Sequence, residues 1–475
     1  MLEDFLKVMP LMTASGISIL LILVEAATKN ARITRLFAIL GFLLVFLSLP
    51  FSPSEPDFAF SNMLQSGGFF TYTATVFSIG GLLITLISDK YLEMEDAHHG
   101  EYYIILFMAV VGMMLMSAAA NLTILFIGLE LMSIALYVLA GIMRDDQRSN
   151  EAAIKYFLLG AFASGIFLYG IALIYGATGT LYIPQISDHL AKNGFDTLFL
   201  SGIALLMIGL LFKVAAVPFH QWSPDVYEGS PTVATAFMAT GAKAAALSSM
   251  ILVGISIAPI LETFTAWPTA IAMIATLTMF FGNIAALIQT NLKRMFAYSS
   301  IAHAGYMLIG IATGTDSGYA GVLYYIFLYT LMNIGAFGII ILVEQKHQFS
   351  ELADYEGFFS RAPLLAFLMA MFMFSLAGIP PFGGFIAKYN VFSAAVQADM
   401  TWLAVAGVIA SAVSVSYYLR VVIAMFMKDT KKQKLNPDPT ATATIALVAF
   451  LVLLFGIYPS LLIEYTQHAL AFAMK

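Results

Sequence analysis

The stretch Leu205–Pro218, LLMIGLLFKVAAVP, carries a lysine within an apolar run that is long enough to cross a membrane, and a proline follows that lysine. A second stretch, Phe374–Lys388, FSLAGIPPFGGFIAK, carries two adjacent prolines ahead of a lysine. Proline removes a backbone donor and clashes with the preceding turn, so each stretch predicts an interrupted helix. In lipid such an interruption persists only beside protein or a water-filled cavity. Both stretches therefore predict polar sites inside a helical membrane protein.

The composition supports this fold class. Hydrophobic residues make up 60% of the chain and charged residues 11%, whereas a soluble domain has about 25% charged residues. Since a spanning helix needs about 20 mostly apolar residues, the runs predict an all-α polytopic protein with about 14 transmembrane helices. The net charge of -6 gives no support for nucleic-acid binding.

The positions of the basic residues predict the orientation in the membrane. With an even number of spans, most lysines and arginines fall in loops on one side, which the positive-inside rule assigns to the cytoplasm. Both termini are then expected on the opposite, outer side. The cytoplasmic set is Lys29, Arg32, Arg35, Lys90, Arg144, Arg148, Lys293, Arg294, Lys346, Arg361, Lys428, Lys431, Lys432 and Lys434, against Lys7, Lys192 and Lys475 on the outer side.

The two interrupted spans are the seventh and twelfth in this prediction, which suggests an internal repeat. An odd repeat length reverses the topology of the second copy, so two inverted five-helix repeats are expected, each with a broken helix, and transporters place ion sites at such breaks. The predicted segments are residues 1–102 with three helices, 103–257 and 258–428 with one repeat each, and 429–475 with a last helix.

Several site classes are excluded by residue type. The chain has no cysteine, so it holds no disulfide and no thiolate-bound zinc or iron–sulfur cluster. Its 7 histidines are too few and too scattered to suggest membrane haems, and no P-loop motif is present. No cofactor or metal site is predicted in this chain.

Ionisable residues inside apolar runs are the candidate site residues. Each costs roughly 2.5–3.5 kcal/mol at the centre of a bilayer and is by default a functional candidate. Lysine, glutamate and histidine all exchange protons, so proton transfer is the chemistry they predict. The set is Glu130, Lys155, Lys213, Lys243, His303 and Lys388.

A structural alternative stands beside each of these roles. Glu130 and His303 could serve as polar packing contacts, and Lys213 could form a structural ion pair with Glu130. Lys155 could be an interfacial anchor, because it closely follows a polar loop, and Lys388 could extend its side chain to the interface, an alternative that also applies to Lys243. The remaining charges are interpreted as solvated loop groups, namely Asp225, Glu228, Lys293 and Arg294, and as an interfacial anchor, Arg420.

Four segments carry a resemblance to a known family. They are GLELMS at Gly128–Ser133, EAAIKYFLLGA at Glu151–Ala161, FKVAAVPFHQWSPDVYEG at Phe212–Gly229, and NLKRMFAYSSIAHAGY at Asn291–Tyr306. The chain resembles the antiporter-like subunit N of respiratory complex I, NADH-quinone oxidoreductase, over roughly residues 103–427. Lys388 favours subunit N over its sister subunit M, which has a glutamate at the matching position.

The resemblance implies a proton-translocating subunit of the membrane arm. Glu130 and Lys213 would form an adjustable pair: moving Glu130 away removes stabilisation of the ammonium, and burial then favours proton release. Lys243 would connect the buried chain, Lys388 would face the exit side, and His303 and Lys155 would be secondary relays.

The family also implies a location and partners. The drive would come from quinone reduction, with NADH, FMN, iron–sulfur clusters and quinone on other subunits. The expected neighbours are the membrane subunits M, L, K and J and the lipid bilayer of a bacterial inner membrane. Two alternatives remain open: a subunit of a multisubunit cation/proton antiporter, and a purely structural subunit of the membrane arm.

Overall fold

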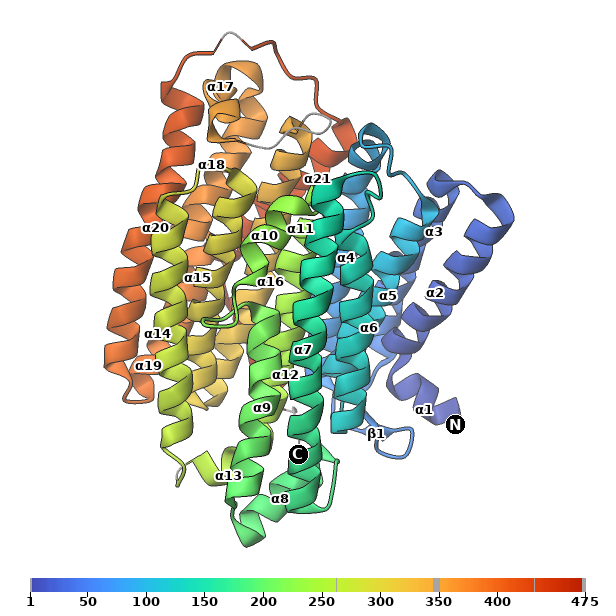
Figure 1. Ribbon diagram of the computed structural model, residues 1–475, viewed down its shortest axis with the longest axis vertical. Helices are drawn as coiled ribbons and strands as arrows, with labels where there is room; N and C mark the ends of the chain where they lie inside the picture. The colour runs from blue at the N-terminus through green and yellow to red at the C-terminus, as the bar shows by residue number, and fades with distance from the viewer. Residues whose placement is uncertain (1, 262, 345–350, 431, 472–475) are drawn as a thin grey trace.

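The computed structural model describes residues 2–261, 263–344, 351–430 and 432–471. Within these ranges the chain is a bundle of helices that lie mostly along one long axis (Figure 1). The sheet in the described part is a small antiparallel hairpin of β1 (Phe58–Ala59) and β2 (Leu64–Gln65). The predicted all-α polytopic class is confirmed.

In the described residues, 13 helical segments are long and apolar enough to cross a membrane. The one remaining predicted span, the twelfth, corresponds to two shorter helices, α18 (Pro363–Ala377) and α19 (Gly383–Gln397), of 15 residues each. The 13 are α2 (Met9–Thr28), α3 (Ala31–Ser48), α4 (Gly68–Met94), α5 (Gly100–Ser117), α6 (Leu122–Ala140), α7 (Gln147–Thr178), α9 (Thr197–Val214), α11 (Thr232–Phe237) continued by α12 (Lys243–Ser256), α14 (Ala266–Leu287), α15 (Leu292–Thr313), α16 (Asp316–Val343), α20 (Thr401–Met427) and α21 (Pro439–Ile457).

Short helices complete the bundle. Figure 1 shows α8, α13 and β1 at one end of the long axis and α17 at the other. The short elements are α1 (Leu2–Lys7), η1 (Leu49–Phe51), α8 (Ile183–Asn193), α10 (Trp222–Gly229), the π-helical turn η2 (Met238–Ala242), α13 (Ala258–Leu261), η3 (Leu352–Tyr355), α17 (Phe358–Arg361) and α22 (Ser460–Ala471).

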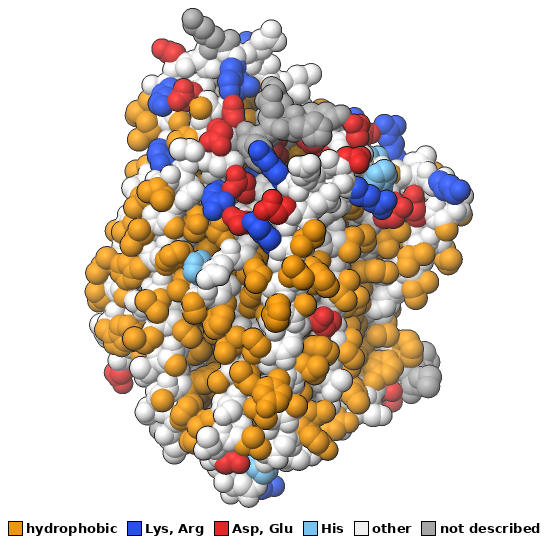
Figure 2. All heavy atoms as spheres, in the orientation of Figure 1, with side chains coloured by type: hydrophobic (Ala, Val, Ile, Leu, Met, Phe, Trp, Pro, Cys, Tyr) orange, Lys and Arg blue, Asp and Glu red, His pale blue; other side chains and the backbone are white. Residues whose placement is uncertain are grey.

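The surface of the bundle is divided by polarity. In Figure 2 hydrophobic side chains cover the middle of the visible face, whereas Lys, Arg, Asp and Glu gather at the end that carries α17. Large apolar side chains are exposed, among them Phe162 at 76% and Ile288 at 79%, as expected where lipid replaces water. The chain is a multi-pass membrane protein. Three cations of the predicted orientation, Lys346, Lys431 and Lys475, lie outside the described residues.

Both predicted helix interruptions are present. Helix α9 ends at Val214, and Ala215 takes a left-handed conformation with φ 58° ahead of Pro218. Helix α18 ends before Gly378, which has φ 85° and caps it, ahead of Pro380 and Pro381. A left-handed cap followed by proline is a common way to end a helix. The grouping into inverted repeats and the four-segment division remain predictions.

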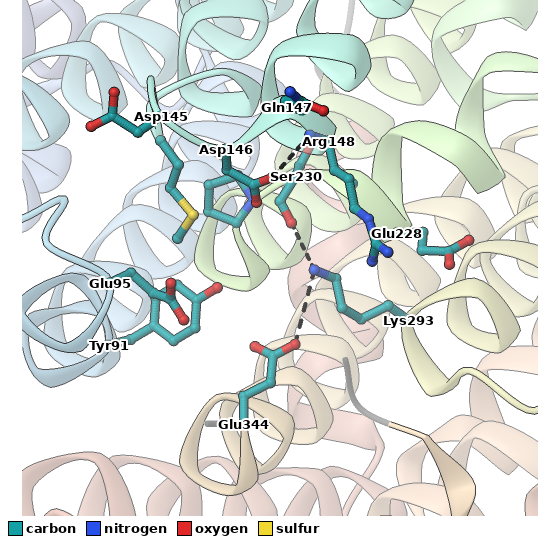
Figure 3. Close-up of a pocket in the computed structure, with 13 residues that line it drawn as sticks. Tyr91, Glu95, Asp145, Asp146, Gln147, Arg148, Glu228, Ser230, Lys293 and Glu344 are labelled. Carbon is teal, nitrogen blue, oxygen red and sulfur yellow. Dashed lines mark hydrogen bonds and ion pairs between the residues drawn. The ribbon is translucent and has the colours of Figure 1, made fainter. Parts of the chain in front are cut away.

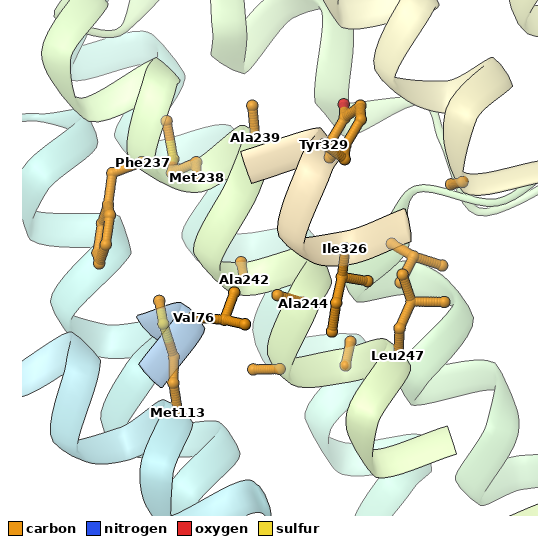
Figure 4. Close-up of a cluster of buried hydrophobic side chains, with 14 of the residues drawn as sticks. Val76, Met113, Phe237, Met238, Ala239, Ala242, Ala244, Leu247, Ile326 and Tyr329 are labelled. Carbon is orange, nitrogen blue, oxygen red and sulfur yellow. The ribbon is translucent and has the colours of Figure 1, made fainter. Parts of the chain in front are cut away.

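The segment from α11 through η2 to α12 forms the centre of the bundle. Within Thr232–Ser256, all side chains of the most apolar stretch of 18 residues are buried. Figure 4 shows Ala239, Ala242 and Ala244 of this segment beside Val76 of α4, Met113 of α5 and Ile326 of α16. Small side chains let helices approach closely, so this segment can place Lys243 in the interior.

Candidate functional site

Lys213 lies in the last turn of α9 and is 1% exposed. Its Nζ donates a hydrogen bond of 3.1 Å to the hydroxyl of Tyr137 on α6. The ammonium also lies near three aromatic rings, 5.1 Å from the Tyr137 centroid, 5.4 Å from that of Tyr156 and 5.6 Å from that of Phe212. A buried cation held by a hydroxyl and ring faces has weaker partners than a carboxylate would provide.

Glu130 lies on α6 and is half-buried. Its carboxylate accepts a short hydrogen bond from the Ser164 hydroxyl of α7. In the described part of the chain, Glu130 and Lys213 make no ion pair within 4.0 Å, although the Glu130 charge still acts on Lys213 electrostatically. Tyr137 lies two turns from Glu130 on the same face of α6. Glu130 and Lys213 are therefore not in direct contact in this structure. Their role as an adjustable pair stays a prediction.

Lys243 directly follows the π-helical turn η2 and is 1% exposed. A π turn inside an α-helix is frequently found at functional sites. The Lys243 Nζ donates a 2.7 Å hydrogen bond to the backbone carbonyl of Ser300 on α15. The interfacial-anchor alternative for Lys243 is wrong, because this side chain ends inside the bundle.

His303 lies on α15, one turn after Ser300, and is 1% exposed. Its Nδ1 lies 2.8 Å from the Tyr325 hydroxyl of α16, and its Nε2 lies 3.1 Å from the Tyr418 hydroxyl of α20. Tyr418 in turn lies 2.5 Å from the Ser299 hydroxyl. A neutral imidazole donates through one nitrogen and accepts through the other, so each ring nitrogen has a partner that can exchange a proton.

Lys388 of α19 is 4% exposed, so the interfacial-anchor alternative is wrong for this residue too. Its Nζ donates to the Ala377 carbonyl at 2.9 Å and to the Ser411 hydroxyl at 2.7 Å. Ala377 is the last residue of α18, so the ammonium lies at the negative end of that helix dipole. The Nζ also lies 4.7 Å from the ring centroid of Tyr306.

One face of α15 joins three of the predicted residues. Ser300 binds Lys243 through its carbonyl, and Tyr306 lies under Lys388. His303 lies between them, with its ring 5.6 Å from that of Tyr306. Residues three apart on a helix share a face, so α15 places Lys243, His303 and Lys388 along one line.

Lys155 does not belong to this line. Its side chain is 41% exposed and forms ion pairs of 2.8 Å with Glu151 and 2.9 Å with Asp225. Arg294 binds Asp225 at 3.0 Å and Glu228 at 2.8 Å. These contacts fit the anchor alternative for Lys155, and its relay role stays a prediction. Asp225, Glu228 and Arg294, which were predicted to be solvated loop charges, form an ion network with Lys155.

Lys293 was predicted to be a solvated loop charge, and this prediction is wrong. Lys293 is 4% exposed, because α15 begins at Leu292 and this side chain points inward toward α16. Its Nζ donates to the Ser230 carbonyl at 2.7 Å and lies 4.0 Å from the carboxylate of Glu344 (Figure 3). Burial raises the pKa of Glu344, and the charge of Lys293 opposes that rise.

Several partners of the site were not identified from the sequence. The sequence did contain a pattern that points to Tyr137, because Tyr137 follows Glu130 by seven residues and therefore lies two helical turns away on the same face of α6. Tyr418 and Ser411 had no such pattern, since they reach His303 and Lys388 from α20, a helix distant in the sequence. Glu344 caps the C-terminal end of α16, at the edge of an apolar run, and was not among the candidates.

One group of possible metal ligands lies elsewhere. One ligand atom each from Asp89, Glu93 and His98 lies within 4.8 Å of the others. Both carboxylates are already paired with cations, Asp89 with Arg35 at 3.0 Å and Glu93 with Arg32 at 2.7 Å. The cluster is therefore assigned as an ion network between α3 and α4.

Comparison with known proteins identifies the family. Residues 119–414 match the family model described as NADH:quinone oxidoreductase/Mrp antiporter, TM. Subunit N of NADH-quinone oxidoreductase from Trichlorobacter lovleyi is 48% identical over 416 residues, which cover 86% of this chain and 85% of that protein. The corresponding subunit from Rhodospirillum rubrum is 40% identical and covers 97% of this chain and 95% of that protein.

Solved structures give the same result. A chain of respiratory complex I from Thermus thermophilus with bound aureothin superposes with a TM-score of 0.84 at 33% identity, covering 96% of this chain and 98% of that one. A chain of the Mrp complex from Dietzia sp. superposes with a TM-score of 0.85 at 21% identity, covering 99% and 97%, and shows the shared fold alone. The chain belongs to the family of subunit N of NADH-quinone oxidoreductase.

Proposed function

We propose that this chain is the proton-translocating membrane-arm subunit N of an NADH-quinone oxidoreductase. Quinone reduction on other subunits drives proton transfer through Glu130, Lys213, Lys243, His303 and Lys388. NADH, FMN, iron–sulfur clusters and quinone bind to those other subunits. The chain itself contributes the buried proton-transfer groups and no redox chemistry.

The observation that carries the proposal is the partner set of the three buried lysines. Each ammonium donates to neutral oxygen atoms: Tyr137 for Lys213, Ser300 for Lys243, and Ala377 with Ser411 for Lys388. Among the described residues no carboxylate lies within 4.0 Å of any of them. A buried lysine that serves structure alone is normally paired with a carboxylate. Without that partner, burial opposes the charged form and the group can release its proton.

The membrane setting follows from the same assignment. The α17 end, where the charged loops gather in Figure 2, faces the cytoplasm of a bacterial cell, and both termini face the periplasm. Subunits M, L, K and J are the neighbours in the membrane arm. A single cysteine introduced near either terminus tests the orientation by its reactivity in sealed right-side-out and inverted vesicles, because the native chain has 0 cysteines.

The test of the function is Lys213→Ala in membranes that contain the assembled complex. Proton pumping and quinone reduction are measured together, after native gel electrophoresis confirms assembly. Loss of both activities supports the proposal. Unchanged pumping per electron contradicts it and favours the purely structural subunit. Co-purification with antiporter subunits, without redox partners, would instead indicate a cation/proton antiporter.

A further inference from the structure

Asn283 is a fully buried amide on α14, a helix whose other buried residues are mostly apolar. Its Nδ2 donates to the Met279 carbonyl and to the Tyr306 hydroxyl of α15, each at 2.9 Å. Its Oδ1 accepts from the Tyr417 hydroxyl of α20 at 3.0 Å. An asparagine amide offers two N–H donors and one oxygen acceptor. Both donors and the oxygen of Asn283 are therefore used, and the side chain has one defined orientation among three helices.

The helices α14 and α15 approach closely at this point, because a glycine precedes each of the two bonded residues. A Cβ at Gly282 would lie 2.6 Å from a backbone nitrogen of α15, and a Cβ at Gly305 would lie 2.7 Å from a backbone nitrogen of α14. These distances leave no room for a larger side chain, as is typical where membrane helices pack through small residues. The short Asn283 side chain can therefore reach Tyr306 on the facing helix.

The Tyr306 ring supports the Lys388 ammonium, with 4.7 Å between the ring centroid and Nζ. Two other rings pack against it at steep angles, His303 at 5.6 Å and 80° and Phe392 at 6.1 Å and 68°. These rings hold the plane of the Tyr306 ring, and the hydrogen bond from Asn283 holds its hydroxyl end. The ring therefore cannot swing about its Cα–Cβ bond without losing that hydrogen bond.

Lys388 also borders a cavity of about 740 Å³, which is lined mainly by α19 and α20. Phe385, Val405 and Ile409 of its walls are exposed, so the cavity opens at the apolar surface of the bundle. The Lys388 side chain thus has the Tyr306 ring of α15 on one side and free space on another. Only a ring that stays in place keeps the ammonium on the side of α15.

We infer that Asn283 is a positioning residue for proton transfer at Lys388, and that it acts by holding the Tyr306 ring under the ammonium. The inference rests on the proposed function. A ring face attracts a cation through its quadrupole, and a neutral amine lacks that attraction. The position of the ring therefore affects how firmly Lys388 holds its proton. Asn283 itself gains and loses no proton, so its contribution is geometric.

The first test replaces the amide with an apolar side chain of similar size, in Asn283→Leu. We expect coupled quinone reduction to slow by about tenfold and its pH profile to differ from that of the wild type, because Lys388 loses its support. A polar residue that only ties helices together would change the melting temperature and leave the pH profile as it is. A wild-type rate and pH profile in Asn283→Leu would overturn the inference.

Tyr72→Phe is the control for the loss of a buried hydrogen bond. The Tyr72 hydroxyl of α4 is buried and donates to the Leu323 carbonyl of α16 at 2.9 Å. We expect this variant to have a lower melting temperature, while the assembled complex keeps the rate and the pH profile of the wild type.

The second test asks whether Asn283 acts through Tyr306. Tyr306→Phe keeps the ring and removes only the hydroxyl that Asn283 holds, so we expect a loss similar to that of Asn283→Leu. The double variant should be no slower than the slower single variant, because both changes remove the same contact. Losses that multiply to about a hundredfold would show that the two residues act independently, and would overturn the inference.

The outcomes separate the two proposals. Wild-type turnover in both Asn283→Leu and Tyr306→Phe, while Lys388→Ala abolishes pumping, would overturn the role of Asn283 and leave the proposed function standing. Unchanged pumping in Lys213→Ala would remove the proposed function and the role of Asn283 with it. If Asn283→Leu does not assemble, the rate and pH profile of Tyr306→Phe still decide the matter.

Discussion

The Lys213 ammonium donates to the Tyr137 hydroxyl at 3.1 Å and is held there without a carboxylate within 4.0 Å in the described part of the chain. A hydroxyl stabilises the ammonium less than a carboxylate does. Under the proposed function, this weaker partner leaves the Lys213 proton exchangeable and makes its release depend on the position of α6. Because Tyr137 and Glu130 share a face of α6, a movement of this helix changes the Tyr137–Lys213 hydrogen bond and the distance between Glu130 and Lys213 together.

Tyr137→Phe tests this contact. The substitution removes the hydrogen bond but keeps the ring under the ammonium. Loss of a hydrogen bond to a charged group costs about 1.5 kcal/mol or more, so we expect coupled turnover to fall by about tenfold. Quinone reduction and proton pumping are measured in the same vesicles.

Tyr156→Phe is the control for that variant. The Tyr156 ring also lies beside Lys213, at 5.4 Å, but its buried hydroxyl has no partner among the described residues. We expect turnover close to that of the wild type. Equal losses in both variants would show that the Tyr137 hydroxyl has no specific role.

Gly378→Ala tests the position of Lys388. Gly378 has φ 85°, and a Cβ there would lie 2.9 Å from the Lys388 Cδ. The left-handed conformation costs an alanine about 1–2 kcal/mol, and the new methyl group displaces the lysine. We expect a lower melting temperature together with loss of pumping.

Gly179→Ala separates the cost of the backbone conformation from the displacement of the Lys388 side chain. Gly179 caps α7 with φ 73°, and a Cβ there would meet nothing within 4 Å. The backbone cost is similar, so thermal stability should fall by a similar amount while protons pumped per electron stay constant. Normal pumping in Gly378→Ala would contradict the assigned position of Lys388.

Local sequence predicted the fold and the breaks. Apolar runs predict spans without knowledge of tertiary contacts, and proline ends a helix whatever surrounds it, as at Pro218 and Pro380. Four buried groups, Lys213, Lys243, Lys388 and His303, were also identified, because an ionisable residue inside an apolar run needs no further context.

The partners of these groups depend on tertiary packing. Lys293 stands next to Arg294 after a polar turn, and the two have the same local signature. Tertiary contacts, with the Ser230 carbonyl and with Glu344 at the end of α16, distinguish the buried Lys293 from Arg294. The Tyr418 hydroxyl reaches His303 from α20. Sequence patterns carry the periodicity of one helix and do not specify which helix lies opposite.

Asp225 makes the stability of the α7, α10 and α15 contact dependent on pH. Burial of the carboxylate opposes ionisation, but hydrogen bonds from Lys155 and Arg294 outweigh it and lower the pKa of Asp225 below its usual 3.8. The folded state then binds fewer protons, so this stabilisation is complete above the usual pKa and is lost as pH falls through the lowered one. We expect Asp225→Asn to lower the melting temperature at pH 7. At a pH near the lowered pKa of Asp225, the variant and the wild type should have the same melting temperature. A difference that persists at low pH would exclude ionisation as the cause.

Arg420 provides a contrasting case in which a membrane cation serves structure. Its guanidinium donates to the Leu287 carbonyl at 2.8 Å and to the Gln289 carbonyl at 2.5 Å. These carbonyls lie at the C-terminal end of α14, where a cation is favoured by the helix dipole. We expect Arg420→Met to lower the unfolding free energy by about 1–3 kcal/mol without changing protons pumped per electron in the complex that assembles. Arg420→Lys should recover part of the lost unfolding free energy. Lysine keeps the positive charge, but its single ammonium cannot reproduce the two guanidinium hydrogen bonds. A change in pumping ratio at unchanged thermal stability would instead place Arg420 among the proton-transfer groups, because loss of a helix cap acts through stability and leaves the coupling of protons to electrons intact.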